Sequence, residues 1–241
     1  VGVSKVFWGV TESQHLVDII NQTDLVESPD GEDKLGQPMA SFSIEESWGT
    51  VDLFVLPFHR ARTFPGEDGR FRTPIVIDGD NAQYSSGAGD NRVDGAIRYS
   101  HYLGDLEFGL SHFSGTSRDP LLTFNGNVND PKLIPIYTVI DQTGLDAQYI
   151  YESWLLKFEG YSRSGYGDRY STAVAGFEYT QVGIFNSNSD IGWVAEYLFD
   201  DRGEAAETFL EQDLFLGIRW TLNDAASSDA LFGMFWDPES E

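Results

Sequence analysis

Hydrophobic and polar residues alternate along most of the chain, as they do in β-strands that bury one face and expose the other. The run from Ala40 to Glu45 is typical, because every second residue in it is apolar. The pattern predicts an all-β protein of about eleven or twelve strands, most of them roughly eight to twelve residues long. We place these strands at residues 3–10, 40–45, 51–55, 93–102, 106–115, 145–151, 154–163, 170–181, 191–199, 213–222 and 230–236.

The connections between these strands alternate between long and short. The long ones are polar and cover residues 11–38, 59–91, 116–142 and 200–212. The short ones are centred on Trp48, Gly104, Ser153, Asn188 and Ser227. Transmembrane β-barrels of bacteria carry long loops at one end and short turns at the other, whereas Greek-key sandwiches mix their loop lengths. We therefore predict a single domain over residues 1–241, an antiparallel up-and-down transmembrane β-barrel or a large part of one.

One loop segment has a helical pattern instead. In residues 12–27, Leu16, Ile19, Ile20 and Thr23 would share one face of a helix. We expect a short helix there, inside the loop formed by residues 11–38.

The polar sides of the predicted strands carry charges of both signs. Lys157, Glu159 and Arg163 share one side of their strand, opposite Leu156 and Phe158. A side of this kind resembles the wall of a water-filled channel, and the alternative is an ordinary sheet face exposed to solvent. The candidate pore-lining or solute-binding residues are Arg98, Glu107, Lys157, Glu159, Arg163, Glu178 and Arg219.

Aromatic residues lie near the ends of the predicted strands. Trp48, Tyr102, Tyr151 and Trp154 are at or beside short turns. Aromatic rings are stable where hydrocarbon meets lipid headgroups, so barrels place them at both interfaces. Aromatic residues also favour strands in general, which is the competing interpretation.

The charge of the chain limits its partners. It has 39 Asp and Glu against 15 Lys and Arg, a net charge of −24, so nucleic acid would be repelled. There is no cysteine, and no run of roughly twenty apolar residues that would form a transmembrane helix.

A basic group stands out in the loop formed by residues 59–91. It contains Arg60, Arg62, Arg70 and Arg72, whose guanidinium groups suit carboxylate or phosphate anions. These four residues are candidate anion-binding residues that would favour the entry of anions. The simpler alternative is a solvated loop in which they pair with Glu67 and Asp68.

We find no pattern that indicates catalysis or a bound metal. The four histidines are scattered without close ligand spacing, and no Gly-x-Ser-x-Gly motif is present. His112 beside Ser111 or Ser114 is the one place where a hydrolase constellation could be sought. We therefore expect no cofactor, no metal and no enzymatic activity.

Several longer runs resemble a porin-like family of outer-membrane β-barrels of Gram-negative bacteria. These runs cover residues 5–9, 18–24, 31–38, 111–120 and 200–203, with the sequences KVFWG, DIINQTD, GEDKLGQP, SHFSGTSRDP and DDRG. The resemblance extends over most of the chain and implies a pore of the outer membrane, in contact with lipids and small hydrophilic solutes. It carries over no functional residues. Self-association into a homo-oligomer is expected only by analogy with other porins.

The sequence departs from that family in its odd strand count and in its polar last residues, 237–241. We therefore expect strands to be missing at both ends. Two alternatives to a porin-like channel remain at this point: a soluble β-barrel that binds a ligand, and a barrel enzyme of the outer membrane.

Overall fold

The computed structural model describes residues 1–28, 30–206 and 212–238, and these form an all-β structure of fifteen strands. Eleven strands make one antiparallel sheet in which each strand pairs with the next one of the sheet along the chain. They are β1 (Gly2–Ser4), β2 (Gln37–Glu46), β3 (Gly49–Leu56), β6 (Asp94–Leu103), β7 (Leu106–Thr116), β10 (Val139–Tyr151), β11 (Trp154–Ser164), β12 (Tyr170–Gln181), β13 (Asp190–Asp200), β14 (Leu214–Thr221) and β15 (Asp229–Trp236).

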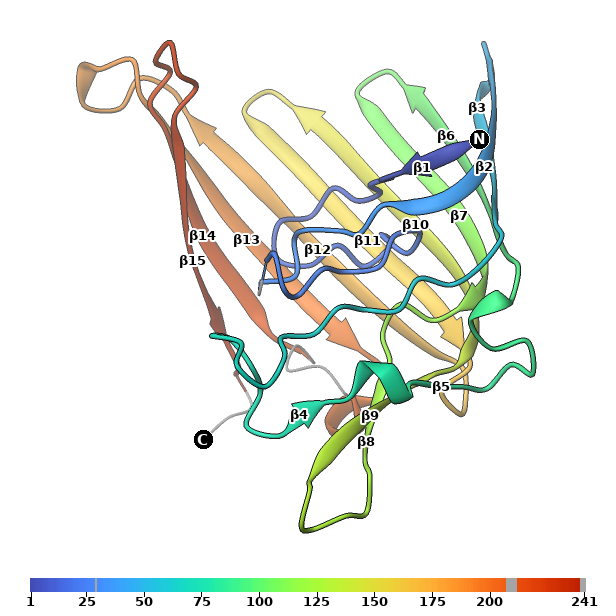
Figure 1. Cartoon of the computed structure of the whole chain (residues 1–241). Helices are drawn as coiled ribbons and strands as arrows, with labels where there is room; N and C mark the ends of the chain where they lie inside the picture. The colour runs from blue at the N-terminus through green and yellow to red at the C-terminus, as the bar shows by residue number, and fades with distance from the viewer. Residues whose placement is uncertain (29, 207–211, 239–241) are drawn as a thin grey trace.

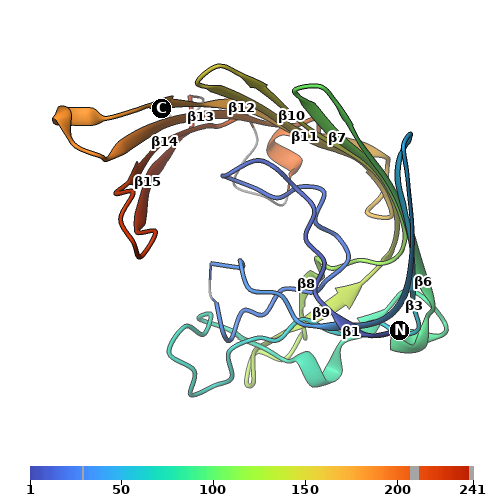
Figure 2. The same cartoon turned by 90° about the horizontal axis from the view of Figure 1, so that it is seen from above.

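The sheet is strongly curved but does not close (Figure 2). Among the described residues, β1 and β15 form its two edges, and no pairing joins them. The all-β antiparallel architecture is therefore as predicted, whereas the closed barrel is not seen. No helix in the described ranges is long and apolar enough to cross a membrane.

Short hairpins join the strands at the end of the sheet that is uppermost in Figure 1. Tyr151 pairs with Trp154 and Leu103 pairs with Leu106, so each of these turns has two central residues. Gly104 has φ +64° and Glu152 has φ +54°, the left-handed conformation that two-residue hairpin turns require. The long connections after β3, β7 and β13 lie at the opposite end, as the loop lengths predicted, whereas the one between β1 and β2 does not.

The longest loops contain structure that the sequence did not predict. Four short strands form a small second sheet below the main one: β4 (Val76–Ile77), β5 (Gln83–Tyr84), β8 (Leu121–Phe124) and β9 (Lys132–Tyr137). The predicted loop at residues 116–142 is correspondingly too long, because β10 begins at Val139. Part of the predicted loop at residues 200–212 lies outside the described residues.

Residues 5–36, the N-terminal segment, lie inside the curve of the sheet (Figure 2). We call the side of the sheet that faces this segment the concave face, and the other side the convex face. The predicted strand at residues 3–10 is wrong beyond Ser4, and the predicted helix within residues 12–27 is absent. The physical reason is that backbone N–H groups of this segment are bonded to carboxylates of the sheet instead of to carbonyls four residues earlier.

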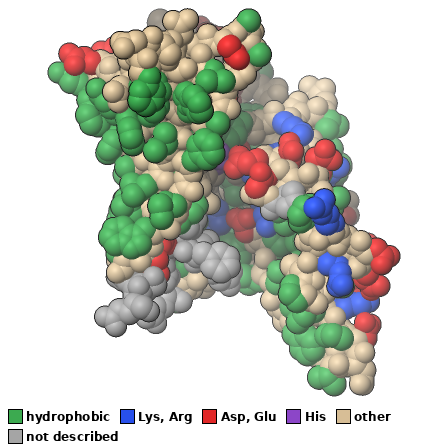
Figure 3. Space-filling model, turned by 90° about the vertical axis from the view of Figure 1, so that its left-hand side faces the viewer, with side chains coloured by type: hydrophobic (Ala, Val, Ile, Leu, Met, Phe, Trp, Pro, Cys, Tyr) green, Lys and Arg blue, Asp and Glu red, His purple; other side chains and the backbone are tan. Residues whose placement is uncertain are grey.

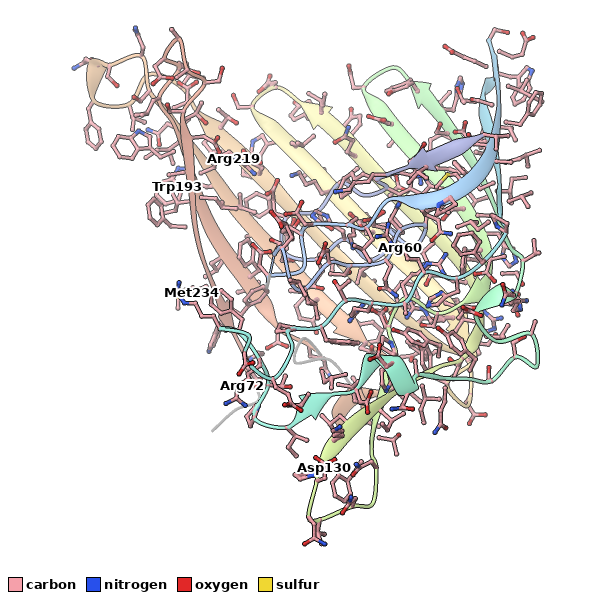
Figure 4. All side chains as sticks on the ribbon, viewed as in Figure 1. Arg60, Arg72, Asp130, Trp193, Arg219 and Met234 are labelled. Atoms are coloured by element: carbon pink, nitrogen blue, oxygen red, sulfur yellow. The ribbon has the colours of Figure 1, made fainter. Side chains whose placement is uncertain are left out.

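Large apolar side chains cover much of the convex face. Leu145, Leu156 and Trp193 are exposed there, as are most of the apolar residues at every second position of the neighbouring strands. At the β15 edge, Phe232 is 65% exposed. Trp193 and Met234 point outward, whereas Arg219 lies on the inner side of the same edge (Figure 4).

Two apolar clusters nevertheless occur inside, where the N-terminal segment packs on the concave face. The larger contains Trp8, Val17, Ile19, Ile20, Met39, Phe54, Leu56, Ala96, Phe113 and Ile140. In the smaller, Leu16 packs on Val174, Val194, Leu198 and Phe215. The segment is thus held by burial of apolar surface as well as by polar contacts.

Candidate functional site

The concave face carries a dense set of charged side chains, which is the candidate functional site. Lys157, Glu159 and Arg163 alternate along β11 and are all buried on this face. The register places Asp146 of β10 directly beside Glu159. Charged side chains are conspicuous in the hollow beside the open edge (Figure 3).

Glu159 anchors the N-terminal segment. One carboxylate oxygen accepts the N–H of Val10 at 2.6 Å and that of Thr11 at 2.9 Å. The other accepts the N–H of Val17 at 3.2 Å. Its exposure is 0%, so these charge-assisted hydrogen bonds replace the water that a buried carboxylate loses.

Glu196 of β13 also anchors the N-terminal segment, and it was not among the predicted site residues. Its two oxygens accept the N–H groups of Glu12 and Ser13, each at 2.8 Å. The alternation gave no signal for it, because Val194 and Leu198 share its side of the strand. Because this side of the strand mixes apolar and acidic residues, the sequence pattern did not predict it to be a polar face.

Glu12 links the N-terminal segment to two cations of the sheet. Its carboxylate oxygens lie 3.0 Å from Lys157 Nζ and 2.6 Å from an Arg219 nitrogen. Glu178 lies 3.7 Å from the same two cations. Partial burial works to raise the pKa of Glu12, but Lys157 and Arg219 outweigh it and hold the pKa below its usual range.

Arg98 forms a bidentate pair across the concave face. Its Nη1 and Nη2 donate to the two oxygens of Asp146 at 2.6 and 2.8 Å. The guanidinium also lies 5.2 Å from the centroid of the Trp8 ring, in a cation–π arrangement. Of the remaining predicted lining residues, Glu107 of β7 accepts a hydrogen bond from Gln148.

A buried polar cluster lies at the lower end of the sheet. Arg118 is 3% exposed and donates to the carbonyls of Ile20 and Thr116, at 3.1 and 2.7 Å. Its Nη1 lies 3.0 Å from His59 Nδ1 and 3.4 Å from an oxygen of Asp94. Burial, together with the charge of Arg118, lowers the pKa of His59 to about 3.

The four loop arginines do not converge. Arg60 is exposed and donates to the Gly36 carbonyl at 2.6 Å, and Arg70 and Arg72 are also exposed. Arg60 and Arg72 lie well apart (Figure 4). The four residues therefore do not form one group, and Arg62 alone turns inward. No ion pair with Glu67 or Asp68 is found either, among the described residues.

Arg62 meets Arg163 at the carboxylate of Asp119. Arg62 Nη2 lies 2.8 Å from one oxygen, and Arg163 Nη1 lies 3.4 Å from the other. Partial loss of solvation works to raise the pKa of Asp119, but the two guanidinium groups outweigh it and hold the pKa below its usual range. No sequence pattern indicated this convergence, because the three residues come from separate segments.

The hydrolase pair considered for His112 is not formed with Ser111. His112 is exposed and its Nδ1 lies 2.9 Å from Thr143 Oγ1. Ser111 is buried on the concave face, and adjacent residues of a strand point to opposite sides. Within the described ranges, no group of three or more His, Asp or Glu residues is placed to hold a metal ion.

Comparison of the chain with protein-family models, curated proteins and solved structures found no match.

Proposed function

We propose that the chain forms the wall of a porin-like channel in the outer membrane of a Gram-negative bacterium, through which small hydrophilic solutes diffuse. The observation that carries the proposal is the sidedness of the sheet. Large apolar side chains cover the convex face, and charged side chains are buried on the concave face. A membrane β-barrel has this arrangement, with lipid outside and polar groups inside.

The exposure of the convex face favours this proposal over a soluble ligand-binding barrel. Soluble monomers rarely expose contiguous apolar patches larger than a few hundred Å², because such surface drives association in water. A soluble barrel also turns its apolar residues inward. Here Glu159, Glu196 and Lys157 face inward instead, while Leu145 and Trp193 are exposed outside.

Aromatic side chains support the same orientation. Trp48 and Tyr99 stack near one hairpin, and Trp154 contacts Tyr179 near another. Both groups lie at the end of the sheet with the short turns, where a lipid headgroup layer would be.

If the sheet lies in a membrane, the backbone groups of its two edge strands need hydrogen-bond partners. Unpaired backbone N–H and C=O groups cost several kcal/mol each in hydrocarbon, on an order-of-magnitude scale. In a membrane, β1 and β15 must therefore be paired. The N-terminal segment would lie within the channel and narrow it, so solutes would pass between charged groups of both signs.

Planar-bilayer recordings test the proposal. The protein, refolded in detergent and added to one chamber, should give stepwise conductance increases, and the same preparation denatured beforehand should give none. Absence of steps from folded protein that has inserted into the bilayer would contradict a channel. The barrel-enzyme alternative is tested separately by lipase and protease assays of the protein and of His112→Ala.

A further inference from the structure

A cavity of about 320 Å³ lies between the N-terminal segment and the lower part of the concave face. Four cations from separate parts of the chain line it: Lys34, Arg62, Arg118 and Arg163. The acidic residues of its lining are Asp18, Asp30, Glu32 and Asp119. Among these, the side chain of Asp119 is 60% exposed although two arginines hold it.

The two arginines that hold Asp119 are fixed by other partners. Arg163 Nε donates to Gln142 Oε1 at 2.7 Å, and its guanidinium lies 4.4 Å from the Tyr161 ring centroid. Arg62 Nε donates to Gln22 Oε1 at 3.2 Å. The guanidinium groups therefore keep their positions when Asp119 is removed or turned away.

A third guanidinium has unused donor capacity. Arg118 lines the cavity, and its Nη2 is buried without a hydrogen-bond partner among the described residues. A buried donor without a hydrogen-bond partner is energetically unfavourable. Two fixed guanidinium groups on an accessible carboxylate, with a third lining the same cavity, make a site for which a second carboxylate can compete.

We propose that this cavity binds small monocarboxylate solutes, whose carboxylate exchanges with that of Asp119 between Arg62 and Arg163. Its role in solute passage rests on the proposed channel, but binding itself does not. A monoanion fits better than a phosphate dianion, because Asp18, Asp30 and Glu32 already line the cavity and repel further negative charge.

The Asp119 carboxylate would help the site to release a bound solute. A channel site must bind well enough to admit a solute and weakly enough to release it. Asp119 competes with every bound carboxylate, so it shortens the time for which the solute stays. Removing this competitor should strengthen binding, whereas removing an arginine should weaken it.

The test is titration of the detergent-refolded protein with sodium acetate by calorimetry at constant ionic strength. Asp119→Asn should bind acetate about five- to tenfold more tightly than the unaltered protein. Asp130→Asn is the matched control, since it changes the net charge equally and frees Lys132 from its ion pair with Asp130, and neither residue lines the cavity. It should leave the affinity within about twofold.

When Arg62→Gln is combined with Asp119→Asn, the gain in acetate affinity should disappear. Arg62 is partly exposed, so this substitution is tolerated better than one at the buried Arg163. Equal tightening of acetate binding by Asp119→Asn and Asp130→Asn, or no tightening by Asp119→Asn, would overturn the site. Acetate binding without conductance would support the binding site and contradict the proposed channel. Conductance without acetate binding would support the channel and contradict the binding site.

Discussion

Glu159 and Thr11 are joined by two hydrogen bonds, from the Thr11 N–H at 2.9 Å and from its hydroxyl at 2.8 Å. They are 148 positions apart in the chain, one on the sheet and the other in the segment that lies inside it. The contact therefore sets the position of the N-terminal segment against the concave face, and with it the width of any passage.

We expect Glu159→Gln to loosen the N-terminal segment. The amide is neutral and has a single acceptor oxygen, so some of the charge-assisted bonds to Val10, Thr11 and Val17 are lost. The free energy of unfolding should fall by about 2 kcal/mol. Hydrogen exchange of residues 8–20 should become faster. Glu178→Gln is the control, because Glu178 contacts Lys157 and Arg219, and exchange equally fast in both variants would refute the anchoring role.

Gly9 provides an independent test of the same contact. Its φ is +137°, and a Cβ there would lie 2.8 Å from Glu159 Oε1. Gly9→Ala should therefore displace the segment and destabilise the fold by about 1–3 kcal/mol. Gly66→Ala, at a loop position with open space, should leave the thermal midpoint nearly unchanged. A midpoint for Gly9→Ala equal to that of Gly66→Ala would show that the approach of Gly9 to Glu159 is unimportant.

The convex face can be probed by placing a charge at its centre. Leu145 lies at the middle of β10 and is 40% exposed, whereas Tyr151 lies at the end of the same strand. In lipid, Leu145→Arg should weaken folding by about 2–4 kcal/mol and Tyr151→Arg by at most about 1 kcal/mol. Urea titrations of the protein in vesicles measure both. Two equal and small effects would mean that this face does not meet hydrocarbon.

The buried His59 should make stability depend on pH. Arg118 can only donate, so Nδ1 of His59 accepts and the ring is neutral. The pKa of His59 is about 3 in the folded protein, below its ordinary value of 6.5. Between these values the unfolded chain binds the extra proton, so stability is full above pH 6.5 and falls as the pH drops toward 3.

This loss should reach about 1.4 kcal/mol for each pH unit. His59→Gln keeps an acceptor for Arg118 but does not titrate. The difference in unfolding free energy between the two proteins should therefore change with pH over this window, while the effects of shared carboxylates cancel. A constant difference between pH 6.5 and 4 would contradict a neutral, buried His59.

Much of the main sheet could be predicted from the sequence. Alternation located strands such as those now seen at Leu106–Thr116 and Trp154–Ser164, because an antiparallel strand with one apolar side leaves a period of two. The alternation also placed Lys157 and Leu156 on opposite sides. The turn positions at Gly104 and Glu152 followed from the same pattern.

Two local expectations failed for a tertiary reason. The helix expected around Leu16 is absent because Glu159 and Glu196 take the N–H groups of this segment. The separation of Arg60 from Arg62 likewise depends on contacts with Gly36 and Asp119, which are distant in the chain.

The sequence by itself determined most strands of the main sheet, their two chemically different sides and the end at which most long connections lie, because each is a property of neighbouring residues. Only the tertiary structure decided that the N-terminal segment enters the curve of the sheet and that Arg62, Asp119 and Arg163 meet. Such contacts join positions 44 to 148 residues apart, where no local period links one partner to the other. They depend on curvature and burial, which the whole sheet establishes together.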